Sequence, residues 1–224
     1  MKKRKKKLDI IYEDKEILVV NKPSGMLTVS TPKEKEKTLF HEVSSYVKKS
    51  NPKAKVFIIH RLDKDTSGIV MFAKNQNVKY KYQNVWDKLC LKRGYVAVVE
   101  GILKEKSGTI KSFLKETKTL LVYSSKDSKN GKLAITKYKV LKESKKYSML
   151  DIEIKTGRKN QIRVHMSDIY TPIVGDKKYG NKKSHFKRLM LHAYNLEIIN
   201  PKTKRKMNFL CDVPKCFNDL FKED

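Results

Sequence analysis

Apolar residues recur along the chain with two spacings, and these predict helices in some segments and strands in others. In residues 38–49 the apolar positions 39, 40, 43 and 47 lie on one helix face, and Thr38 stands where an N-cap belongs. Residues 78–89 show the same spacing at 78, 82, 85, 86 and 89, which predicts a second helix. We expect its aromatic side chains to pack in the core rather than to stack on nucleic-acid bases.

Extended segments dominate the rest of the pattern. The stretches DIIYE and EILVVNKPSG at residues 9–25 predict a hairpin that ends in turn residues. Beyond residue 93, the runs YVAVVEG, GTIKSFL, LAITKYKVL and SMLDIEIKTG suit antiparallel strands, several of them half-exposed. The predicted fold class is therefore α+β, with a large, mainly antiparallel mixed β-sheet flanked by a few helices. No break in composition marks a second domain, so we expect a basic tail at 1–8 and one catalytic domain at 9–224.

Length and cysteine usage place the chain among ordinary intracellular proteins. At 224 residues it can bury a core without disulfides or a structural metal. The three cysteines form no CxxC pair, which indicates free thiols in a reducing cytoplasm. The opening MKKRKKK is followed by acidic residues, unlike a signal peptide, and no segment approaches the ~20 apolar residues of a membrane span. We expect a cytoplasmic protein with no membrane association.

The charge balance indicates a polyanionic partner. Lys and Arg number 52 against 24 Asp and Glu, a formal net charge of +28. So many positive side chains repel one another unless a polyanion binds to them, and nucleic acid is the first candidate for that polyanion.

The most informative polar cluster is HRLDKDTSG at residues 60–68, between the apolar runs VFII and IVMFA. DKDTSG satisfies the DxDx(T/V) pattern of haloacid dehalogenase phosphatases, but these need further carboxylates for magnesium, and GDKKYG offers only Asp176. Alternatively, the functional motif is HRLD rather than DKDTSG. An aspartate such as Asp63 is ordinarily ionised at neutral pH and can act as a nucleophile or stabilise positive charge. Taken alone, HRLD also fits a turn with a structural ion pair.

Several further motifs, in their order along the chain, resemble the motifs of a known family. HRLDKDTSGIVMFAK, RGYVAVVEG, KTGRKNQIRVHM, PIVGDKKYG and RLMLHAYNLEIINP, preceded by YEDKEILVVNKPSGMLTV, resemble the RluA-type family of RNA pseudouridine synthases. The resemblance covers residues 9 to about 217. It implies a pseudouridine synthase fold with an active-site cleft across the sheet, isomerisation of uridine in structured ribosomal or transfer RNA, and no cofactor or metal.

The resemblance also assigns residues. Asp63 matches the catalytic aspartate, attacking the sugar or stabilising the separated intermediate. Tyr95 matches the tyrosine that packs against the target base, and Arg163 the arginine that pairs with the aspartate. Arg61 would fill the gap left by the flipped nucleotide. RNA binding is assigned to Arg61 together with His60, Lys64 and Arg158.

Other motif residues receive structural predictions. Asp176 is predicted to form a turn rather than to act as a second catalytic carboxylate. His60, His165 and His192 are predicted to make structural hydrogen bonds rather than to bind metal.

The chain also departs from the family pattern. The family commonly shows TGRTHQIR, whereas this chain has Lys159 and Asn160 in place of Thr-His, and Tyr170 replaces a glycine before PI. We expect neither departure to touch Asp63, Tyr95 or Arg163. Since about eight residues precede the catalytic segment, we expect no S4-type RNA-binding domain, and a monomer with no protein partner implied.

Three functional hypotheses follow from the sequence. The first is an RNA pseudouridine synthase. The second is a magnesium-dependent phosphoryl hydrolase that uses the DKDT segment, and the third is a basic RNA-binding protein without catalysis. Chelation of metal and replacement of Asp63 distinguish them.

Overall fold

The computed structural model describes residues 8–182 and 184–222, which form two compact units. The first unit takes in the chain up to Leu91 together with Leu196–Cys211, and the second takes in Lys92–Asn195 and the chain from Asp212. Residues 1–7 of the predicted basic tail lie outside the described residues. The single catalytic domain at 9–224 stays a prediction.

The first unit is built on a sheet in which β1 (Ile10–Glu13), β2 (Ile17–Lys22), β4 (Ser67–Ala73) and the end of β10 (Leu191–Ile199) follow in that order. Strand β3 (Phe57–Ile58) pairs with β4, and β11 (Lys206–Leu210) pairs with β10. The pairs β1–β2, β2–β4 and β3–β4 are antiparallel. The predicted hairpin is confirmed, and the Asp14 carboxylate closes its turn by accepting from the amides of Glu16 and Ile17, both at 2.7 Å.

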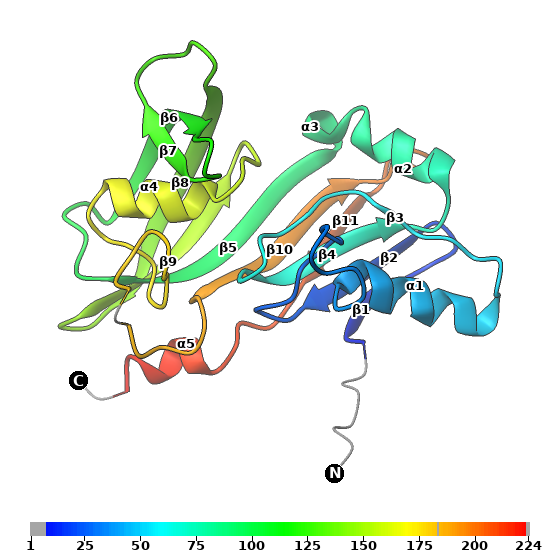
Figure 1. Cartoon of the computed structure of the whole chain (residues 1–224), viewed down its shortest axis with the longest axis horizontal. Helices are drawn as coiled ribbons and strands as arrows, with labels where there is room; N and C mark the ends of the chain where they lie inside the picture. Colours follow the sequence, from blue (N-terminus) through cyan, green and yellow to red (C-terminus); the bar gives the residue numbers. More distant parts are fainter. Residues whose placement is uncertain (1–7, 183, 223–224) are drawn as a thin grey trace. The chain divides into compact units, whose positions relative to one another are not determined.

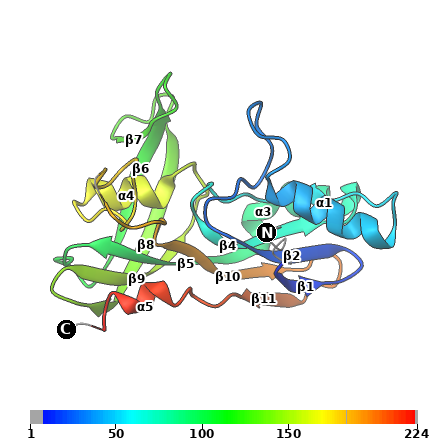
Figure 2. The ribbon, with the colours of Figure 1, turned by 60° about the horizontal axis from the view of Figure 1, so that its bottom comes forward.

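Helix α1 (Leu39–Ser50) begins where the sequence predicts. The Thr38 hydroxyl accepts a hydrogen bond from the His41 amide at 3.2 Å, as an N-cap does. The helix buries Leu39, Val43 and Val47 and lies beside β1 and β2 (Figures 1 and 2). The helical spacing in this segment therefore marks the face that the helix buries.

The single helix predicted for residues 78–89 is wrong. The segment forms two helices, α2 (Gln76–Gln83) and α3 (Trp86–Leu89), and between them Val85 has φ −130° and ψ 29°. Asn and Val are weak helix formers, which favours a break at 84–85. Val85 consequently leaves the apolar face and is 39% exposed, whereas Tyr82 is buried as predicted.

The second unit contains the beginning of β10 and then, in order across the sheet, β5 (Cys90–Glu100), β9 (Tyr147–Ile154), β8 (Lys132–Glu143), β6 (Ser107–Glu116) and β7 (Val122–Ser125). The pairs β5–β9, β9–β8, β8–β6 and β6–β7 are antiparallel. The predicted strands are confirmed. The sequence pattern missed β7, which has only 4 residues.

Helices complete the second unit. Helix α4 (Gln161–Asp168) lies against β6 and β8 (Figures 1 and 2), and α5 (Cys216–Asp219) buries Phe217. The predicted α+β class, with a mainly antiparallel sheet and few helices, is confirmed. Among the residues that the structure describes, no helix is both long and apolar enough to span a membrane.

Candidate functional site

Asp63 lies in an irregular segment that joins β3 to β4 in the first unit. Its side chain is half-buried, while those of Arg61 and Lys64 on either side are exposed. Asp63 is therefore not sealed in the interior.

A buried lysine forms a hydrogen bond with the backbone of this segment. Lys22, at the end of β2, is 0% exposed. Its ammonium donates to the carbonyls of Pro23 at 3.0 Å, Met26 at 2.8 Å and Lys64 at 2.9 Å. One cation thus joins the turn after β2 to the residue next to Asp63.

The turn that follows Lys22 adds direct bonds to the segment around Asp63. The Gly25 amide donates to the Lys64 carbonyl at 3.0 Å, with Gly25 at φ +82°, a backbone conformation that glycine adopts without strain. The Ser24 hydroxyl donates to the Asp65 carbonyl at 2.6 Å. The two residues after Asp63 are therefore fixed by two adjacent residues of one turn.

Thr28 fixes the residue before Asp63. Its buried hydroxyl donates to the Leu62 carbonyl at 2.7 Å and accepts from the Leu62 amide at 3.3 Å. We call residues 22–28 the cradle of the Asp63 segment. The sequence analysis did not predict it, although NKPSGMLTV was the stretch that carries the family resemblance at the start of the domain.

His60 has a structural role, as predicted. Its Nε2 accepts from the Met71 amide at 3.2 Å, and its ring stacks on Trp86 with centroids 5.3 Å apart. His60 thereby ties the start of the Asp63 segment to β4 and α3. Its assignment to RNA binding stays a prediction, as do those of Arg61 and Lys64.

Tyr95 belongs to β5 in the second unit and lies opposite Ile152 of β9. It is half-buried and packs against the core of that unit. The preceding Gly94 is required by packing, because an added Cβ would lie 3.0 Å from the Asn195 Cβ and 3.1 Å from the Tyr194 ring. The contact of Tyr95 with a target base stays a prediction.

Arg163 is buried on α4 and forms a bidentate ion pair with Asp176. Its Nε and Nη2 each donate to an Asp176 oxygen at 2.7 Å, and Nη1 donates to the Asn160 oxygen at 3.1 Å. Burial opposes ionisation of Asp176, but the Arg163 guanidinium and two backbone amides hold the pKa of its carboxyl below the ordinary value. The sequence analysis did not predict this pair. The pairing of Arg163 with Asp63 stays a prediction.

The turn predicted at Asp176 is confirmed. One of its oxygens accepts from the amides of Lys178 and Tyr179, both at 2.9 Å. The same carboxylate therefore shapes the turn and orients the arginine. A short carboxylate that bonds backbone amides two and three residues ahead is a signal visible in sequence, whereas its pairing with α4 is not.

The departures from the family pattern have structural explanations. Asn160 has φ +55° and Tyr170 has φ +61°, and asparagine is among the residues that tolerate this region best. Tyr170, which replaces a glycine, is 92% exposed, so its side chain meets no packing constraint. The expectation that the departures leave Arg163 untouched is wrong for Asn160, which accepts from its guanidinium. Lys159 forms an ion pair with Glu116.

The remaining candidates lie in the second unit. Arg158 is exposed and its Nε donates to the Leu133 carbonyl at 3.0 Å, so its contact with RNA stays a prediction. His165 bonds Thr136 at 2.9 Å and Ser112 at 3.0 Å, which confirms its structural role, while the His192 ring packs edge-on against Phe217. Within residues 8–182 and 184–222, no group of three or more His, Cys, Asp or Glu could hold a metal ion.

Comparison with known proteins gives consistent matches. The model of the RNA pseudouridylate synthase family matches residues 16–168. The chain is 37% identical to ribosomal large subunit pseudouridine synthase D of Borreliella burgdorferi, over 96% of this chain and 69% of the relative. It is 32% identical to tRNA pseudouridine synthase C of Haemophilus ducreyi, over 96% of this chain and 95% of the relative.

A solved structure shares the fold. Human RNA pseudouridylate synthase domain containing 4 superposes with a TM-score of 0.78 at 22% identity, covering 93% of this chain and 90% of that one. At this level of identity the likeness establishes the pseudouridine synthase fold.

Proposed function

Because the chain belongs to the RluA-type family of RNA pseudouridine synthases, we propose that it isomerises uridine to pseudouridine in structured RNA, with Asp63 as the catalytic carboxylate. The observation that carries the proposal is the half-buried Asp63 in a segment bonded to the cradle on both sides. A reaction that holds a detached base in place needs a carboxylate whose position is set before substrate arrives.

The chemistry suits a carboxylate without a cofactor. The bond from ribose C1′ to uracil N1 breaks, the base turns, and C1′ bonds to C5. The C5 hydrogen leaves as a proton and N1 takes one up, so the reaction is an isomerisation. C1′ becomes electron-poor as the base departs, and an anionic Asp63 can bond to it or stabilise its charge.

The other residues receive supporting roles. A base within a helix or folded loop must leave its stack to reach Asp63, at a cost of a few kcal/mol. The exposed Arg61 is suited to fill the gap, because a guanidinium stacks on bases and also bonds phosphate. Tyr95 would pack against the flipped uracil, and Arg163 would pair with Asp63 to keep it ionised.

The partner that we propose is ribosomal or transfer RNA. The relatives named above act on one or the other, and a net charge of +28 favours a polyanion. His60, Lys64 and Arg158 would contribute to this binding. We further propose that the protein acts as a monomer in the cytoplasm.

The test compares two aspartates of one segment. In cells that lack the protein, wild type, Asp63→Asn and Asp65→Asn are each restored, and pseudouridines are mapped across cellular RNA by carbodiimide-stop sequencing. We expect wild type and Asp65→Asn to restore a defined site and Asp63→Asn to leave it unmodified. Asp65→Asn is the matched control because it makes the same change two residues away, where the Asp65 carbonyl bonds the cradle.

Two outcomes would favour the other hypotheses. Modification that persists with Asp63→Asn would support a non-catalytic RNA-binding protein. With purified protein and the mapped RNA, EDTA should leave pseudouridine formation unchanged, because no step assigned to Asp63, Tyr95 or Arg163 uses a metal. A phosphatase activity that EDTA abolishes, without pseudouridine formation, would support the magnesium-dependent hydrolase.

A further inference from the structure

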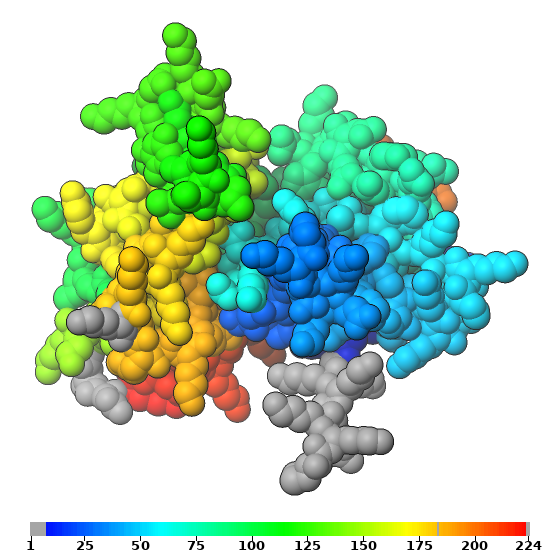
Figure 3. Space-filling view, viewed as in Figure 1, coloured from blue at the N-terminus to red at the C-terminus, as the bar shows by residue number. Residues whose placement is uncertain are grey.

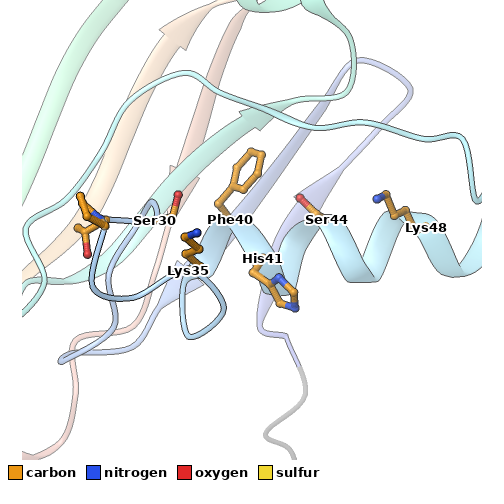
Figure 4. Close-up of a pocket in the computed structure, with 8 residues that line it drawn as sticks. Ser30, Lys35, Phe40, His41, Ser44 and Lys48 are labelled. Atoms are coloured by element: carbon orange, nitrogen blue, oxygen red, sulfur yellow. The ribbon is translucent and has the colours of Figure 1, made fainter.

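A pocket lies between α1 and the segment that precedes it, within the first unit. Its volume is about 620 Å³, and its lining residues are Ser30, Thr31, Pro32, Lys35, Phe40, His41, Ser44 and Lys48. Phe40, Ser44 and Lys48 stand at successive turns along one side of α1, with Ser30 and Lys35 on the preceding segment (Figure 4). Figure 3 shows this segment and α1, in blue, at the surface of the viewed face. We call this pocket the α1 groove.

The α1 groove is connected to the Asp63 segment through Thr28. The Phe40 amide donates to the Thr28 carbonyl at 3.0 Å, and the Thr28 hydroxyl donates to the Leu62 carbonyl at 2.7 Å. Leu62 directly precedes Asp63. A wall of the groove and the Asp63 segment are therefore bonded to the same residue.

The lining chemistry favours a nucleic-acid strand. The lining contains Lys35 and Lys48, both exposed, and no carboxylate. Phe40 is half-buried, so part of its ring is accessible, and the hydroxyls of Ser30 and Ser44 add hydrogen-bonding groups. Cations with an accessible aromatic ring are the combination that binds single-stranded nucleic acid, by phosphate contacts and base stacking. The core of a protein–protein interface is depleted in lysine, whereas Lys35 and Lys48 both line this groove.

We propose that the α1 groove binds a single-stranded segment of the substrate RNA next to the target uridine. A base of this segment stacks on Phe40, and its phosphates contact Lys35 and Lys48. The inference rests on the proposed function for the identity of the RNA. It adds a second point of attachment, which holds the strand that flanks the flipped nucleotide.

The first experiment removes the two cations and compares a matched pair. Lys35→Gln/Lys48→Gln is set against Lys33→Gln/Lys49→Gln, which removes two exposed lysines from the same segment and helix but outside the groove lining. The probe is a fluorescein-labelled hairpin RNA with a uridine-rich loop, titrated by anisotropy over a series of salt concentrations. Loss of two single-strand phosphate contacts, at about 0.7 each, should make the slope of log K against log salt shallower by about 1.4.

The control pair should change that slope by less than half as much. Equal slopes for the two double variants would overturn the proposal, because the groove would then bind RNA no better than any other basic surface. The proposal is also overturned if Lys35→Gln/Lys48→Gln weakens binding of inorganic phosphate or uridine monophosphate while RNA binding stays at the control level. That result would indicate a site for a small anion.

The second experiment tests the stacked base. The hairpin carries 5-iodouridine in its loop, and the irradiated complex is digested with trypsin and analysed by mass spectrometry. We expect an RNA adduct on Phe40, within the peptide 38–48, that Phe40→Leu removes. Adducts confined to other aromatic residues, such as the exposed Tyr80 and Tyr123, would overturn the assignment.

The results separate the inference from the proposed function. If wild type forms pseudouridine but the two double variants bind RNA alike, the groove proposal fails alone. If the adduct and the slope change are found but no pseudouridine forms, the groove binds RNA and the catalytic proposal fails.

Discussion

Lys22 is a buried residue that bonds the backbone next to Asp63. An ammonium buried without partners is costly. Lys22 donates to two carbonyls of the turn that follows it and to the Lys64 carbonyl, 42 residues further along the chain. Each of these carbonyl oxygens accepts a hydrogen bond from the ammonium and so stabilises the buried cation.

Replacing Lys22 with Met should destabilise the protein and lower activity together. Three hydrogen bonds are lost, at about 1 kcal/mol each, so we expect the free energy of unfolding in urea to fall by about 2–3 kcal/mol. Lys15→Met is the control, since Lys15 is exposed in the turn between β1 and β2. An unfolding free energy for Lys22→Met equal to that of Lys15→Met would contradict a supporting role for these bonds.

At the scale of the element, α4 is held in the second unit by polar contacts as much as by apolar ones. Gln161 donates to the Ile135 carbonyl and the Thr136 hydroxyl, both at 3.0 Å, and His165 bridges Thr136 and Ser112. Arg163 pairs with Asp176 on the opposite side. Because these bonds have directions, they set the rotation of the helix about its axis, which apolar packing alone sets less sharply.

The free energy of unfolding should depend on pH in a way that reflects the burial of His165. Burial lowers the pKa of His165 below 6.5, although Asp168 opposes the shift. The unfolded chain therefore takes up a proton near pH 6.5 while the folded protein does not. Stability should be full above about pH 6.5 and fall as the pH drops toward the lowered pKa. We expect urea unfolding of His165→Asn to depend less on pH between 7.5 and 5.5 than that of wild type.

The control for this experiment is His41→Asn, because His41 is exposed on α1. It should keep the pH dependence of the wild type. A His165→Asn variant with the full wild-type dependence would assign the effect to other groups.

At the scale of the whole molecule, the net positive charge favours the binding of RNA. Lysines are distributed along the chain rather than gathered in one segment, and the net charge is +28. Contacts of these charges with phosphates attract RNA but carry no sequence information. Selection of one uridine must then come from the shape of the RNA and from contacts near Asp63.

Binding of transfer RNA should therefore weaken steeply as salt rises. Each neutralised phosphate releases counterions, so log K should fall linearly with log salt, with a slope that corresponds to several contacts. Filter binding from low to moderate sodium chloride measures the slope, with sucrose at matched osmolality as the control. A nearly flat slope would contradict binding through the basic surface.

Much of the local structure could be predicted from the sequence. The β1–β2 hairpin, helix α1 with its Thr38 cap and most strands of the second unit follow from spacing within short segments, where each signal is contiguous. The resemblance of ordered motifs likewise singled out Asp63, Tyr95 and Arg163. The break at Asn84–Val85 escaped prediction because the apolar spacing continues through it.

The sequence by itself determined the family, most of the elements and the identity of the candidate catalytic carboxylate, because motifs and periodicities depend on residues that are close together along the chain. Only the tertiary structure decided what holds that carboxylate in position. The Thr28–Leu62 bond joins residues 34 apart, and the Arg163–Asp176 pair joins a helix to a later turn. Such contacts depend on which segments the sheets bring together, and no local pattern encodes that choice.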